Sequence, residues 1–317
     1  MKRSILPLKP TAMSLRIWLT VFLAALFLAS CKKEEEVVFS NNTIPPYDEI
    51  PTLLVENYVN RLYIDLIGRE PIDLEMTADV ATLEQFNLSK AARITLVQKL
   101  MFSANDAGGE ATYKEAYYRK LYEDQKARFL DGAGEGALNE DYSLWRSIAY
   151  NDSLNGNMFG YEIFMLEANK LLALMNSMGE LREGTITIDE MARRMMFNSH
   201  YDEINMNSFN FINASFDDCF FRFPTESELE SVFPTIEFNG PGALFGQAIS
   251  TKSDYLLVLT NSGEFSEGMI RWCYRSLLAR DATSFEVSQA LPLFNPGYNT
   301  PITQQNILIS DEYAGFD

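Results

Sequence analysis

Apolar residues follow a helical spacing from about residue 53 onward. Val59, Leu62, Tyr63 and Leu66 are separated by the i, i+3, i+4, i+7 intervals that place one apolar stripe along a helix. The strict alternation that is typical of half-buried strands is scarce in the rest of the chain. The pattern therefore predicts an all-α fold.

The stripe recurs in three segments that align without gaps, residues 57–76, 210–229 and 269–287. In each segment it is followed by an arginine and, six residues later, by a glutamate. The matching residues are Arg69, Arg222 and Arg280, then Pro71 and Pro224, and finally Glu75, Glu228 and Glu286. Repetition at this length indicates related supersecondary units. We predict an amphipathic helix, a tight turn after the arginine and a second helix in each of the three segments.

Local signals support these units. Thr225 with Glu228, and Thr283 with Glu286, have the spacing of capping boxes that begin the second helix. The first two segments also carry charged pairs at i and i+4, which are Asp65 with Arg69 and Asp218 with Arg222. Upstream of the later two segments, residues 193–201 and 256–265 each predict a helix that ends in Asn-Ser followed by an aromatic residue.

The three arginines allow two interpretations. Their guanidinium groups could bind carboxylates or sugars. Alternatively, each could close its turn by capping the preceding helix or by pairing with a nearby acid. Because the arginine recurs beside the turn in every copy, we favour the structural role.

The repeats divide the chain. We predict a first helical unit at 53–108, a helical insertion at 109–185, and the second and third units with a tail at 186–317, which together form one compact body. The insertion contains a Met- and Leu-rich helix over about 158–183. Residues 233–250 contain Pro234 and Pro241 and predict the longest break. The chain from Pro296 onward is predicted to be irregular.

The N-terminus predicts a signal peptide over residues 1–30. A basic start is followed by an apolar stretch, Ile17–Leu28, which is too short to span a bilayer as a helix. Leu28-Ala29-Ser30-Cys31 resembles a bacterial lipobox, and the resemblance implies cleavage before Cys31 and attachment of lipid to that residue. The alternative is an ordinary signal peptide in which the cysteine occurs by chance.

A charged run follows this cysteine and consists of Lys32, Lys33, Glu34, Glu35 and Glu36. It resembles the surface-export signal of Bacteroidota lipoproteins, and the resemblance implies an outer-membrane protein that is exposed on the cell surface. The alternative is a solvated spacer without a signal. Together with the Pro- and Asn-containing residues that follow, it makes 31–52 a lipidated tether.

The repeated pattern resembles a bacterial helical domain of unknown function found in secreted and surface proteins. In that domain a helix ending Asn-Ser-x-x-Phe precedes Leu-Tyr-x-x-Leu-Leu-Gly-Arg-x-Pro, and the match is best at 262–281 and 58–71. It also resembles the helical modules of planctomycete-type cytochrome-associated surface proteins. Phe221 and Ala279 replace the turn glycine, and no Cys-x-x-Cys-His is present, so the resemblance implies a helical fold without haem or another cofactor.

Composition excludes some classes of function. The chain has 317 residues, with 26 Lys and Arg against 44 Asp and Glu, which gives a formal net charge of −18. A sequence-independent nucleic-acid binder needs a basic face, and electrostatic docking on anionic lipid needs a basic patch. We therefore expect no nucleic-acid partner.

Residues suited to catalysis are few. His200 is the single imidazole, and we expect it to be a helix-end or turn residue rather than a base or a zinc ligand. The glycines of residues 131–136 predict a helix–helix loop, because they lack the spacing of a phosphate loop. Acidic clusters such as Asp217-Asp218 are expected to be solvated faces. Cys219 and Cys273 could form a disulfide, but we favour two buried free thiols.

Three hypotheses about function remain at this point. The first is a non-catalytic, lipid-anchored helical protein that acts as an interaction or accessory subunit of an outer-membrane secretion, assembly or uptake complex. The second is a surface lipoprotein that binds a glycan or nutrient through some of its many aromatic residues. The third is an envelope hydrolase that uses carboxylate chemistry. We favour the first.

Overall fold

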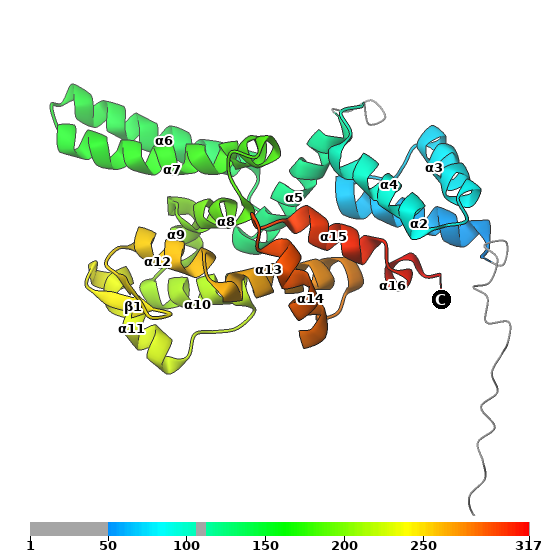
Figure 1. Cartoon of the computed structure of the whole chain (residues 1–317). Helices are drawn as coiled ribbons and strands as arrows, with labels where there is room; N and C mark the ends of the chain where they lie inside the picture. Colours follow the sequence, from blue (N-terminus) through cyan, green and yellow to red (C-terminus); the bar gives the residue numbers. More distant parts are fainter. Residues whose placement is uncertain (1–49, 106–111, 317) are drawn as a thin grey trace, which may run out of the picture. The chain divides into compact units, whose positions relative to one another are not determined.

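The computed structural model describes residues 50–105 and 112–316, which belong to one compact unit, Pro46–Asp317. Fifteen helices and one short hairpin form this part of the chain, which confirms the predicted all-α fold (Figure 1). The helices are α2 (Thr52–Ile67), α3 (Asp73–Gln85), α4 (Lys90–Phe102), α5 (Tyr113–Phe129), α6 (Glu135–Leu154), α7 (Met158–Glu183), α8 (Ile188–Met196), α9 (Ser199–Asn205), α10 (Ser208–Phe220), α11 (Glu226–Phe238), α12 (Lys252–Thr260), α13 (Gly263–Leu278), α14 (Ser284–Phe294), α15 (Thr300–Leu308) and α16 (Asp311–Ala314).

The three aligned segments form the helix pairs α2–α3, α10–α11 and α13–α14. In each pair the first helix ends at a residue in the left-handed region, with φ of 77° at Gly68, 58° at Phe221 and 53° at Ala279. Both predicted capping boxes form, at Thr225 and at Thr283. The same backbone turn therefore recurs even where glycine, the residue best suited to it, has been replaced.

A further element precedes the second and third pairs and recurs after the third. Helices α8, α12 and α15 each end beside a Ser or Asn that caps the next helix, and an aromatic residue follows three positions later. The caps and their aromatic residues are Asn198 with Tyr201, Ser262 with Phe265, and Ser310 with Tyr313. The sequence predicts the first two of these elements, and the structure adds the third.

The prediction of an irregular chain from Pro296 onward is wrong. Asn299 caps α15 by accepting a hydrogen bond from the backbone N–H of Ile302, and Pro301 lies in the first turn of the helix. Proline is well tolerated there, because the first N–H groups of a helix have no partner within it. Here a proline that suggests a break belongs to the start of a helix.

The C-terminal helices complete the first repeat. Tyr313 of α16 donates a hydrogen bond to Asp65 of α2 (2.7 Å), and Tyr201 of α9 donates one to Asp218 of α10 (2.8 Å). Asp65 and Asp218 occupy the same position in their copies, four residues before the arginine. Helices α15 and α16 therefore supply to α2 what α8 and α9 supply to α10.

The predicted break at 233–250 is also wrong in part. Helix α11 continues through Pro234 to Phe238, and strands β1 (Gly242–Leu244) and β2 (Gln247–Ile249) form an antiparallel hairpin. A proline inside a helix removes one hydrogen bond without always ending it. A strand of only three residues is too short to be recognised from the alternation of apolar and polar residues.

The insertion consists of α5, α6 and α7. Tyr113, Tyr117 and Leu121 of α5 are buried, and the long α7 spans the residues predicted for it. The glycine-containing segment at 131–136 joins α5 to α6, as predicted. Helix α6 packs chiefly on α7, and α7 packs in turn on α5 and α8. Among the described helices, none has the length and apolar character needed to cross a membrane.

Candidate functional site

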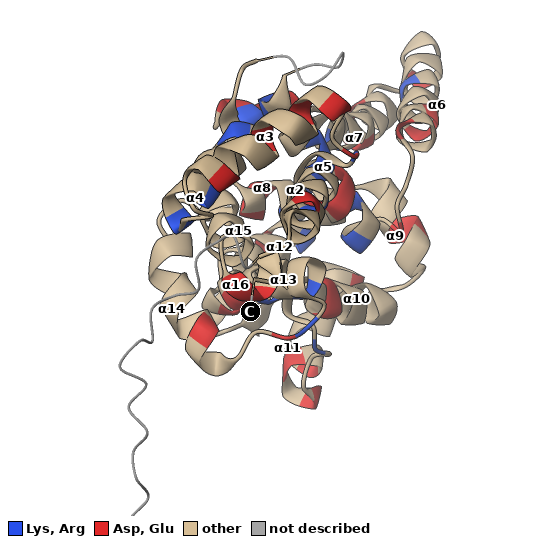
Figure 2. Cartoon of the chain, turned by 90° about the vertical axis from the view of Figure 1, so that its right-hand side faces the viewer, with Lys and Arg blue, Asp and Glu red and all other residues tan. Residues whose placement is uncertain are grey.

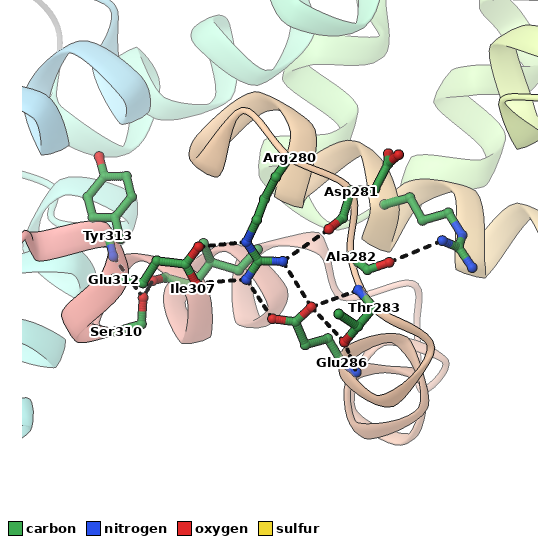
Figure 3. Close-up of polar contacts among 10 residues, drawn as sticks. Arg280, Asp281, Ala282, Thr283, Glu286, Ile307, Ser310, Glu312 and Tyr313 are labelled. Carbon is green, nitrogen blue, oxygen red and sulfur yellow. Dashed lines mark hydrogen bonds and ion pairs between the residues drawn. The ribbon is translucent and has the colours of Figure 1, made fainter.

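The arginine of the third repeat is held on two sides by carboxylates (Figure 3). Its Nη1 and Nη2 donate to Glu286 at 3.0 and 2.7 Å, and its Nε and Nη2 donate to Glu312 at 2.6 and 2.7 Å. The remaining Nη1 hydrogen is directed to the carbonyl oxygen of Asp281 (3.0 Å). All five N–H donors of Arg280 are therefore used within the chain.

Arg222 is held in the same way. It donates to both carboxylate oxygens of Glu228 (2.9 Å each), to the carbonyl oxygen of Phe223 (3.1 Å) and to both oxygens of Glu264. Glu264 and Glu312 lie at the starts of α13 and α16, where each follows a capping serine by two residues. Each arginine therefore joins its own turn to the element that begins the next unit.

The first repeat retains one of the two carboxylate partners of its arginine. Arg69 donates to both oxygens of Glu75 (2.7 and 2.8 Å) and to the carbonyl oxygen of Glu70 (2.8 Å). In place of a second carboxylate, Tyr113 at the start of α5 donates to Glu75 (2.6 Å). A hydroxyl group thus replaces the acid while the connection to the following element is kept.

These contacts set the charge of the glutamates. Hydrogen bonds from Arg222 and from the capping Thr225 hold the pKa of Glu228 at about 2, and those from Arg280 and Thr283 do the same for Glu286. The clusters leave few free donors for a ligand, so the geometry favours the turn-closing role over carboxylate or sugar binding. Pro71 and Pro224 lie in the turns that these arginines close.

The charged pairs predicted at i and i+4 do not form. Asp65 pairs with Arg61 and accepts the hydrogen bond from Tyr313, while Arg69 turns to Glu75. Asp218 accepts from Tyr201, and its burial raises the pKa of its carboxyl group to about 7. The arginine lies beyond the end of its helix, where it reaches the next helix more readily than its own.

Neither cysteine of the repeats forms a disulfide. Cys219 and Cys273 are free and fully buried, as favoured from their apolar neighbours. The thiol of Cys219 lies 3.8 Å from the sulfur of Met196. Burial raises the pKa of Cys273 to about 12 and that of Cys219 still higher, so both thiols stay protonated and unreactive.

The single histidine has a partner that the sequence could not indicate. Nδ1 of His200 lies 2.8 Å from Asp141 of α6, and the preceding residue, Ser199, accepts a hydrogen bond from the indole of Trp145 (2.8 Å). His200, Glu203, Asp141 and Glu140 line a hollow of about 330 Å³ between α6 and α9. The hydrogen bonds of His200 and Ser199 connect α9 to α6.

Other candidate motifs give no site. Ser262 caps α13, and Ser266 is buried within that helix, so neither hydroxyl is free and exposed. Within residues 50–105 and 112–316, no group of three or more His, Cys, Asp or Glu side chains is arranged to hold a metal ion. Acidic positions are spread over many helices, α9, α11 and α16 among them (Figure 2). Cys31, the run Lys32–Glu36 and the predicted signal peptide lie outside the described residues.

The most unusual surface of the described chain is the outer half of the α6–α7 hairpin. Large apolar side chains there are exposed to solvent, namely Leu144, Tyr150, Leu154, Met158, Phe159, Ile163 and Leu166. The hairpin extends beyond the helices that pack against its base (Figure 1). Phe159, Ile163 and Leu166 have helical spacing, and a sequence cannot distinguish an exposed stripe of this kind from one that is covered by a neighbour.

Comparisons with known proteins give no further guide. No protein-family model, curated protein or solved structure matches the chain.

Proposed function

We propose that this protein is a lipid-anchored helical subunit of the bacterial outer membrane that acts through contact with other proteins rather than through catalysis. The observation that carries the proposal is the exposed apolar surface on the α6–α7 hairpin. Large exposed apolar patches on soluble proteins usually mark interaction sites. Support also comes from the lipobox-like Leu28–Cys31 and from the repeated helical units, which form broad surfaces suited to partners.

The role we propose is that of an accessory component of a secretion, assembly or uptake complex. The run Lys32–Glu36 favours exposure on the cell surface. The saturated arginine clusters and the buried thiols support a scaffold whose polar groups stabilise the fold.

Membrane fractionation and protease shaving of intact cells test this proposal. We expect the wild-type chain in the outer-membrane fraction, sensitive to added protease, and a Cys31→Ala variant released from the membrane. After gentle detergent extraction, the wild-type chain should co-purify in a fixed ratio with another envelope protein. A chain that is soluble, or that always migrates alone, would contradict the proposal.

A further inference from the structure

One face of α7 is packed against the rest of the chain along its inner half and exposed to solvent along its outer half. Phe159, Ile163, Leu166, Lys170, Ala173 and Ser177 recur at intervals of three and four residues and therefore share one stripe. At the inner end, Arg194 of α8 donates to the carbonyl oxygen of Ala173 (2.9 Å) and approaches Ser177. At the outer end, Phe159 is 75% exposed, Leu166 56% and Ile163 43%.

Helix α6 contributes to the same side of the hairpin. Asp141 and Trp145 face α9 through His200 and Ser199, and Leu144, which lies one turn along α6 from Asp141, is 55% exposed. Leu166 lines a hollow together with Ala173 of α7 and Arg194 of α8, so the exposed part of α7 continues the side of the hairpin that α8 covers. Together the four apolar side chains expose on the order of 400 Å², which is comparable to the largest apolar patch on a typical monomer, a patch that is often functional.

The chain itself shows what kind of helix fits this face. Helix α8 buries its apolar residues, Met191, Ala192 and Met195 among them, and covers the inner half of the α7 stripe. At the edge of this contact Arg194 pairs with Glu180 of α7 (2.6 Å). An amphipathic helix with a basic residue beside its apolar face is therefore already seated on α7.

The exposed outer half of this face also combines apolar side chains with acidic residues at its edge. Glu140 and Glu162 on the hairpin and Glu203 on α9 are exposed, and none of the three has an ion-pair partner among the described residues. Lys170, one turn beyond Leu166 on the same stripe, is paired with Glu167 (2.7 Å), and Arg146 is two residues from Leu144 and so about 200° around the helix from it. The apolar patch is therefore edged by unpaired acids.

We propose that this surface, Leu144, Phe159, Ile163 and Leu166 with Glu140, Glu162 and Glu203 at its edge, binds an amphipathic helix of another protein that carries Lys or Arg beside its apolar face. This inference rests on the proposed function and names the chemistry of the partner. Such a helix would continue the line of α8 along α7. A second copy of this chain is disfavoured as the occupant, because its acids would meet those of the first.

Site-specific photo-crosslinking tests the inference in cells that naturally express the chain. The photoreactive residue p-benzoylphenylalanine replaces Phe159 in the full chain. Two matched controls place it at Phe285 of α14 and Phe238 of α11, which are each 72% exposed. We expect an adduct from position 159, mapped by mass spectrometry to a segment of another protein with helical apolar spacing and flanking Lys or Arg.

Charge reversal provides the second arm. Glu162→Lys should lower the yield of the adduct at position 159 about fivefold. Glu230→Lys, which changes an exposed acid of α11, should leave the yield unchanged. Both side chains lack ion pairs in the described chain, so both variants should fold.

Other outcomes would overturn the inference. These are an adduct to a second copy, to lipid or to a segment without basic residues, or equal yields in the two charge variants. Adducts from the control positions alone would also overturn it, while the proposed function would stand. No adduct at any position, together with a chain that purifies alone, would count against both.

Discussion

At the scale of single residues, the repeated arginines connect neighbouring units through side-chain hydrogen bonds. We expect Arg222→Met to lower the free energy of unfolding by about 2–3 kcal/mol, because charge-assisted hydrogen bonds are lost and Glu228 and Glu264 are left facing each other. Arg146→Met is the matched control, since Arg146 contacts only Tyr142 among the described residues. Urea unfolding at pH 7 measures both.

The pH dependence of this loss follows from Glu228. The pKa of Glu228 lies near 2 in the folded protein and near 4.5 in the unfolded chain, so its contribution is present above about pH 4.5 and disappears as the pH falls toward 2. The difference between wild type and Arg222→Met should therefore shrink in acid. A difference that is constant from pH 7 to pH 3 would contradict an ion-pair origin.

The pKa of Asp218 shifts in the opposite direction to that of Glu228, so its effect on the pH dependence of stability is also opposite. Burial raises the pKa of its carboxyl group from 3.8 to about 7, so the folded protein holds a proton there that the unfolded chain has already lost. The free energy of unfolding should therefore fall as the pH rises from about 4 to 7. Asp218→Asn does not titrate and can still accept the hydrogen bond from Tyr201. At pH 8 it should be more stable than wild type by on the order of 2 kcal/mol.

This prediction is checked by urea unfolding at pH 4.5, 6 and 8. The two proteins should have nearly equal stability at pH 4.5 and diverge as the pH rises. Parallel curves would show that Asp218 does not take up a proton on folding.

Sequence reasoning found the arginines but not the acids that complete their clusters. Glu75, Glu228 and Glu286 stand at a fixed interval after each arginine and are visible in the alignment. Glu264 and Glu312 lie 42 and 32 residues further along the chain from their arginines, so only the folded structure brings them close. One signal was available, because each of these acids lies between a capping serine and an aromatic residue.

At the scale of helices, α10 and α13 approach each other at a glycine. A Cβ atom on Gly268 would lie 1.9 Å from the carbonyl oxygen of Cys219, a backbone atom that cannot move aside. Gly268→Ala should therefore separate the two helices and lower the free energy of unfolding by about 1–3 kcal/mol. Thermal and urea unfolding measure the effect.

Gly179 of α7 is the control for this change. It also lies within a helix, but a Cβ atom there would meet nothing within 4 Å. Because alanine favours the helix, Gly179→Ala should raise the free energy of unfolding by about 0.5–1 kcal/mol. If both variants change stability in the same direction, helix propensity rather than close packing controls Gly268.

Helix positions were largely predictable, whereas the surroundings of each helix were not. The apolar period placed α7 at its observed residues, yet Leu171 and Leu174 are buried while Phe159 and Leu166 on the same helix are exposed. Periodicity reports that a stripe exists and not what covers it. The same limit explains why the exposed apolar surface of the α6–α7 hairpin is apparent only in the folded chain.

At the scale of the whole described chain, the first repeat is assembled from segments more than 200 residues apart. Tyr58 of α2 donates to the carbonyl oxygen of Leu308, and Arg93 of α4 donates to that of Ile309. Tyr313 is buried against Tyr58 and donates to Asp65. The repeated sequence pattern does not reveal this long-range assembly, because the parts of the first repeat lie at opposite ends of the described chain. Helices α2 and α3 come first, and α15 and α16 come last.

Removing residues 309–317 should therefore weaken the N-terminal helices rather than only the end of the chain. The truncation deletes the buried Tyr313, the acceptor of Arg93 and the Glu312 partner of Arg280, so we expect the free energy of unfolding to fall by roughly 3–5 kcal/mol. Tyr313→Phe keeps the ring and removes one hydrogen bond, so it should cost only about 1 kcal/mol.

Hydrogen exchange distinguishes this closure from simple fraying of a terminus. In the truncated chain, amides of α2 should exchange faster, because α2 loses the element that covers it. Amides of the α6–α7 hairpin provide an internal control, since that hairpin has no main contact with α15 or α16. Unchanged protection in α2 would mean that the first repeat stands without the C-terminal helices. Faster exchange confined to α2 and its neighbours would show that long-range contacts between the two ends, and not only contacts between adjacent repeats, determine the stability of this fold.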